Sequence, residues 1–144
     1  HQYLALSPDE LERNIAETPD PARRERKRQT IQLGLDAPGA PPALKTYDSV
    51  LGRMQTQLSD GRPWLMGDQY TLADVAMTPY VVRLDHLSLA GMWADRPQVG
   101  DWLGRIRERD NFGAISNYIT DAYMPLMAEK GAEAWPKVQT ILAG

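Results

Sequence analysis

The chain has 144 residues, of which 42% are hydrophobic and 24% are charged, so it has the size and composition of one globular domain with a sizeable core. It contains no cysteine, which excludes a disulfide framework, a thiolate zinc site and a cysteine nucleophile, and which fits a cytoplasmic protein. The net charge of −3 argues against nucleic acid as the main partner, and no segment approaches the roughly 20 apolar residues of a membrane span.

The first part of the sequence predicts two short helices, each introduced by a capping residue followed by proline. Residues 7–10 (Ser-Pro-Asp-Glu) have the pattern of a capping box, and they predict a helix that runs to about Glu17. Asp20-Pro21 repeats the signal, so a second helix is expected over residues 21–33, with Gly34 as its C-terminal stop. Thr18 precedes a proline and therefore separates the two helices.

The second predicted helix carries a basic run. Residues 23–28 hold five positive charges and one negative charge. A run of this kind is typical of a solvated helix face. The functional alternative is an electropositive wall beside an anionic ligand.

A loop and a clear amphipathic helix follow. Residues 36–42 are rich in proline, glycine and alanine, and they predict a loop. Apolar residues then recur at steps of three and four, which predicts a helix from Pro42 to about Leu58. The residues on its apolar face are Leu44, Tyr47, Leu51, Met54 and Leu58.

The strongest helix start in the sequence lies at Thr71. The hydroxyl of Thr71 can cap a free backbone N–H, and Asp74 three residues later can reach back to the cap, which completes a capping box. Tyr70 and Val75 are placed as a hydrophobic staple. The helix that follows, to about Leu87, is apolar nearly all round, so we expect it to be buried on every side. Thr71 and Asp74 therefore predict a folding signal rather than an acid–base pair.

Arg83 stands alone as a charge in the apolar stretch of residues 80–84. Because arginine is rarely buried without a partner, two interpretations remain open. Arg83 pairs with a carboxylate such as Asp85 or Asp95, or it lines a cleft as a ligand residue.

The rest of the chain predicts further helices and no strands. Pro79 lies inside the capped helix and predicts a bend near residues 75–79. Residues 88–96 predict a loop. Helices are expected over residues 97–109, 112–130 and 133–143, with Pro125 as a possible interruption and Gly131 between the last two. The predicted fold is all-α, a bundle of six or seven helices.

Few residues suggest chemistry. The two histidines are His1 and His86, and neither lies at a metal-ligand spacing from other ligands, so no metal site is predicted. There is no Ser/His/Asp motif and no glycine-rich phosphate loop. The sequence therefore offers no catalytic residue.

The order and spacing of the motifs over residues 64–76, 79–84 and 97–109 resemble the C-terminal, all-helical domain of glutathione S-transferases. Thr71 and Asp74 match that family's N-capping box. The resemblance is clear over residues 42–115, and the flanking segments look like those of bacterial members of the β-etherase-like and omega-like groups.

This resemblance implies that residues 1–144 are one domain of a larger enzyme. In the family, an N-terminal thioredoxin-like domain, absent from this chain, binds the co-substrate glutathione and carries the catalytic residue. The glutathione thiolate attacks an apolar electrophilic small molecule. The helical domain binds that molecule and contributes to a homodimer. By resemblance, Arg83 lies near the substrate pocket, and Arg24 and Arg28 are weaker candidates for substrate binding.

Two other functions remain open at the level of sequence. Helical domains of this family also join subunits in translation factors and tRNA synthetase complexes, so a non-catalytic protein-interaction module is the main alternative. A helical bundle can also carry apolar ligands.

Overall fold

The computed structural model describes residues 3, 6–116 and 123–144. Within these ranges the chain forms seven α-helices and no strand, which confirms the prediction of an all-α bundle of six or seven helices. None of the described helices combines the length and the apolar character that crossing a membrane requires.

The first two helices begin and end close to the predicted residues. Helix α1 spans Pro8–Ala16, and both hydrogen bonds of the predicted capping box are present at its start. Helix α2 spans Pro21–Leu33 and is capped by the carboxylate of Asp20, which accepts a hydrogen bond of 2.6 Å from the N–H of Arg23. No residue of α2 is buried, as expected for a solvated helix.

Helix α3 spans Ala40–Leu58 and therefore starts inside the segment that was predicted to be a loop. The physical reason is that Pro41 and Pro42 lie in the first turn, where a missing backbone N–H costs no hydrogen bond. A short 3₁₀ helix, η2 (Gly34–Asp36), fills the other end of that segment. The predicted loop over residues 36–42 is thus confined to residues 37–39.

Helices α4 (Leu72–His86) and α5 (Pro97–Arg107) form the centre of the molecule together with α3. The segment between them holds a second 3₁₀ helix, η3 (Ala90–Trp93), where the sequence predicted a loop. The core is contributed mainly by these elements and by α7, and its largest fully buried members are Trp102, Leu51, Leu58, Ile106, Val81, Val99 and Val138.

The expectation that α4 is buried on every side is wrong. One face carries the buried residues, whereas Leu72, Val75 and Tyr80 are 83%, 48% and 52% exposed. At 100° per residue, these three residues fall within an arc of about 140°, so they lie on one side of the helix. Helix α4 therefore has two apolar faces, and the described part of the chain covers only one of them.

The end of the chain also differs from the prediction. Helix α6 spans Phe112–Ser116, and helix α7 runs without interruption over Met124–Ala143. Residues 117–122, including Tyr118 of the predicted helix, lie outside the described residues. Gly131 does not end a helix as predicted: it lies buried inside α7, and a Cβ atom there would come within 1.6 Å of the carbonyl oxygen of Leu87. Gly131 thus permits close contact between α7 and the end of α4.

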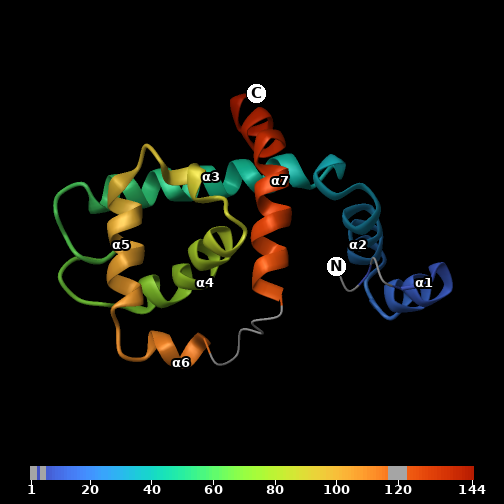
Figure 1. Cartoon of the computed structure of the whole chain (residues 1–144), viewed down its shortest axis with the longest axis horizontal. Coiled ribbons are helices and arrows are strands. Elements are labelled where there is room, and N and C mark those ends of the chain that lie inside the picture. The colour runs from blue at the N-terminus through green and yellow to red at the C-terminus, as the bar shows by residue number, and fades with distance from the viewer. Residues whose placement is uncertain (1–2, 4–5, 117–122) are drawn as a thin grey trace.

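Figure 1 shows how these elements are arranged. Helices α5 and α7 each cross α3, and α4 lies between them, in agreement with the contacts of α3 and α4 with both α5 and α7. Helices α1 and α2 lie to one side of this body and pack on each other.

Candidate functional site

The carboxylate of Asp74 is the most densely bonded polar group in the core. Asp74 is fully buried. Its Oδ2 accepts hydrogen bonds from the N–H of Thr71 at 3.0 Å and from the Thr71 hydroxyl at 3.2 Å. The Thr71 hydroxyl oxygen in turn accepts from the N–H of Ala73 at 3.3 Å. The geometry is that of a structural cap at the start of α4.

The second oxygen of Asp74 reaches beyond its own helix. Oδ1 accepts a hydrogen bond from the N–H of Leu65 and another from the indole Nε1–H of Trp102 on α5, both at 2.9 Å. Burial raises the pKa of Asp74, but these four hydrogen bonds to the charged form outweigh it, and the pKa lies below its ordinary value. Sequence reasoning did not identify Trp102, although a buried indole N–H generally needs an acceptor.

The turn before α4 carries an aromatic cluster. The rings of Trp64 and Tyr70 pack edge to face with their centroids 5.0 Å apart. The guanidinium of Arg109 lies 3.6 Å from the centre of the Tyr70 ring. A cavity of about 440 Å³ is lined by residues 108–111, which include Arg109, and none of the predicted ligand residues lines it.

Arg83 lies on the exposed side of α4 and is not paired as predicted. Asp85 forms its ion pair with Arg107 of α5, because residues two apart on a helix point to different sides. Asp95 lies instead beside Arg96, at 3.7 Å. The Nη1 of Arg83 donates to the sulfur of Met127 on α7 at 3.1 Å.

Arg83 has aromatic neighbours that sequence reasoning did not connect with it. Tyr80 precedes it by one turn on the same exposed side of α4. The ring of Tyr47 from α3 packs edge to face on Tyr80, with 6.2 Å between centroids. His86 follows by one turn, and its pKa is lowered by burial and by the charges of Arg83 and Arg107. A cationic group thus lies next to exposed aromatic surface, an arrangement suited to an apolar ligand with a polar substituent.

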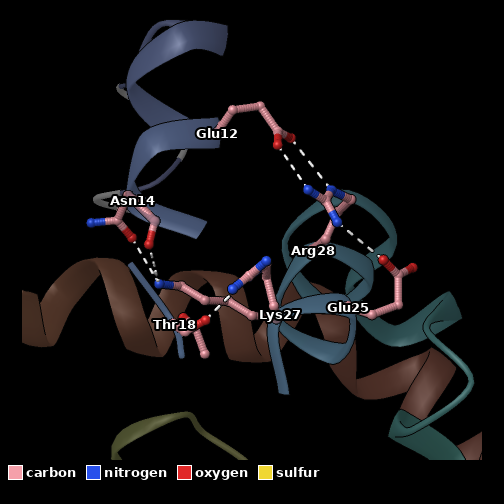
Figure 2. A network of polar contacts seen from close by, with 7 residues as sticks. Glu12, Asn14, Thr18, Glu25, Lys27 and Arg28 are labelled. Atoms are coloured by element: carbon pink, nitrogen blue, oxygen red, sulfur yellow. Dashed lines mark hydrogen bonds and ion pairs between the residues drawn. The ribbon is translucent and has the colours of Figure 1, made fainter. Parts of the chain in front are cut away.

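Arg28 lies on α2 and contacts α1 (Figure 2). Arg24 lies on the same helix and contacts the turn after α1. Arg28 forms ion pairs with Glu12 at 2.8 Å and with Glu25 at 3.0 Å. The Nε of Arg24 donates to the carbonyl oxygen of Thr18 at 3.1 Å. In the described part of the chain, no hydrogen bond or ion pair brings either arginine together with Arg83 on α4.

Comparison with known families supplies the context for this geometry. Residues 9–105 match the sequence model of the C-terminal domain of glutathione S-transferases. The match covers more than half of the chain, begins within α1, includes the whole capping box of α4 and ends within α5. No solved structure matches the chain.

Proposed function

Because the chain belongs to the family of glutathione S-transferase C-terminal domains, we propose that it is the substrate-binding and dimerisation domain of a glutathione transferase. In the whole protein, a thioredoxin-like domain of the β-etherase-like or omega-like kind holds glutathione. The glutathione thiolate attacks an apolar, electrophilic small molecule in the cytoplasm. The observation that carries this proposal is the family match over residues 9–105.

The exposed apolar side of α4 supports the presence of a second domain. Leu72, Val75 and Tyr80 lie along it, and Met66 in the preceding turn is 70% exposed. Contiguous apolar surface is uncommon on isolated globular domains and usually marks a place where another body binds. In this proposal the thioredoxin-like domain covers the start of α4 and leaves the region around Arg83 open to ligand.

The proposed ligand residues have different roles in binding. Arg83 supplies a cationic hydrogen-bond donor beside the exposed ring of Tyr80, so it binds a polar substituent of the electrophile while the ring contacts its apolar body. Arg24 and Arg28 contribute positive charge from α2 as secondary ligand residues. No catalytic hydroxyl or thiolate is assigned to this chain, because that group belongs to the domain that binds glutathione.

The proposed roles of the two domains predict which protein shows glutathione-dependent turnover. This chain alone is expected to give no glutathione-dependent turnover of a generic electrophile such as 1-chloro-2,4-dinitrobenzene, because it lacks the proposed thiolate-binding half. The whole natural protein is expected to show turnover under the same conditions. The measurement is the rate of conjugate formation by absorbance, with the uncatalysed reaction subtracted. Turnover by this chain alone would contradict these roles, and an inactive whole protein would favour the non-catalytic interaction module.

Replacement of Arg83 by glutamine in the whole protein tests the ligand site. We expect kcat/KM for the electrophile to fall about tenfold through a raised KM, since one charge-assisted hydrogen bond to the ligand is lost. The KM for glutathione should stay unchanged, because glutathione is held by the other domain. Arg53→Gln on α3 is the matched control, since Arg53 is also an exposed arginine on a central helix. Equal kinetics of the two variants would remove Arg83 from the site.

A further inference from the structure

Helices α1 and α2 are joined by polar contacts between the second half of α1 and the middle of α2 (Figure 2). The Nζ of Lys27 donates to the backbone oxygen of Asn14 at 3.0 Å and to its side-chain oxygen at 2.8 Å. The ion pair between Arg28 and Glu12 joins the same two helices at the neighbouring residue of α2 and at the middle of α1. Arg24 of α2 also donates to the carbonyl oxygen of Thr18 after α1, and Ile15 of α1 is fully buried. These contacts hold α1 and α2 together as one body, here called the arm.

The arm has little attachment to the rest of the molecule. Among residues 3, 6–116 and 123–144, no hydrogen bond or ion pair joins a residue before Gly34 to a residue after Gly39. The main hydrophobic cluster includes Leu35 as its first packed residue and none before it. Ile15 of α1 is fully buried yet does not belong to that cluster. The arm therefore has interior packing of its own.

The segment directly after the arm is fixed to the body. Leu35 packs against the main cluster, Ala37 is buried, and the carboxylate of Asp36 forms an ion pair with Lys137 of α7 at 2.5 Å. Between this fixed segment and the last turn of α2 stands Gly34, with φ +56° and ψ −121°. Only glycine adopts such torsion angles without strain, and no neighbouring atom would contact a Cβ at this position.

We propose that the arm, residues 7–33, pivots as a rigid body about Gly34 relative to the body formed by α3–α7. A stiff two-helix unit, a fixed segment after it and a single glycine between them are the parts of a hinge. The motion stands apart from the proposed function. One consequence rests on that function: the pivot changes the position of Arg24 and Arg28, the proposed secondary ligand residues, relative to Arg83.

The absence of cysteine makes the motion measurable, because introduced cysteines are the only sites for thiol-directed spin labels. Three pairs of exposed positions are labelled in otherwise unchanged protein: Ala16 with Arg26 inside the arm, Ser49 with Gln139 inside the body, and Arg26 with Gln139 across the hinge. We expect the distance distribution across the hinge, measured by pulsed dipolar spectroscopy, to be about twice as broad as either control. A distribution as narrow as the controls would overturn the proposal.

A matched pair of glycine substitutions locates the pivot. Gly34→Ala forces the torsion angles at this residue to change, so the mean distance across the hinge should shift while both control distances stay the same. Gly39→Ala has ordinary torsion angles and open space around the new methyl group, so it should shift nothing. Equal distances in the two variants would show that Gly34 is not the pivot. The labelled pairs in unchanged protein test the motion whether or not Gly34→Ala folds, and kinetics in the whole protein separately test the proposed function.

Discussion

Replacing Asp74 by alanine is expected to lower the free energy of unfolding by about 4 kcal/mol, which is a large part of the roughly 5–15 kcal/mol that stabilises a typical domain. The change removes the cap of α4 and also leaves the N–H groups of Leu65 and Trp102 without their acceptor inside the core. Each buried donor left unpaired costs about 1–3 kcal/mol, in addition to about 1 kcal/mol for the cap. Thermal and urea unfolding followed by circular dichroism measure the loss.

The chain contains its own control for this experiment. Glu10 occupies the same position in the capping box of α1, but it is exposed and binds only Ser7. Glu10→Ala should therefore lower the free energy of unfolding much less than Asp74→Ala does. If both variants unfold at similar urea concentrations, the long-range bonds of Asp74 contribute little and the interpretation is wrong. Trp102→Phe removes one of the donors to Asp74, so its loss of stability should lie between those of Asp74→Ala and Glu10→Ala.

Gly131→Ala is expected to destabilise the protein by about 3 kcal/mol, although alanine is ordinarily the better helix former. The new Cβ would lie 1.6 Å from the carbonyl oxygen and 2.4 Å from the carbonyl carbon of Leu87. These are backbone atoms, so α7 must move away from the end of α4 and lose packing along its length. The midpoint of urea unfolding measures the effect.

Substitutions at two other glycines serve as comparisons for Gly131→Ala. Gly52 inside α3 has open space for a Cβ, so Gly52→Ala should be stabilising by about 0.5–1 kcal/mol through the unfolded chain. Gly91→Ala should have an intermediate effect on stability. The new Cβ would lie 2.2 Å from the ring of Trp135, but this side chain can adopt another rotamer. A Gly131→Ala variant as stable as the parent would mean that the α4–α7 contact is looser than described.

The contrast between Gly34 and Gly131 shows what sequence can predict about this fold. Both glycines follow a predicted helix, and both were interpreted as helix ends. Gly34 is one, with a positive φ, because the chain turns away there. Gly131 instead allows two helices to pack closely. This role depends on Leu87, which lies 44 residues away in sequence, so no local sequence pattern could predict it. Helix starts marked by a cap and a proline were predicted well, because those signals act within one turn.

The candidate site was predicted less fully than the fold. The capping residues Thr71 and Asp74 follow from spacing alone, but Trp102 as the partner of Asp74 lies 28 residues away and depends on how α5 packs on α4. Arg83 was recognised as unusual from its apolar neighbours. Of the two interpretations left open for it, pairing with Asp85 or Asp95 is not observed, because Asp85 pairs with Arg107 and Asp95 lies beside Arg96. The ligand role of Arg83 stays a prediction.

The two bonds of Asp74 Oδ1 have a consequence for the order in which the chain folds. Leu65 is nine residues from Asp74, so closing this loop costs little chain entropy and can happen early, before distant helices meet. The bond to Trp102 spans 28 residues and requires α5 to be in place. One carboxylate thus takes part in a local nucleus and in the later docking of helices. A defect at Asp74 should slow folding as well as speed unfolding.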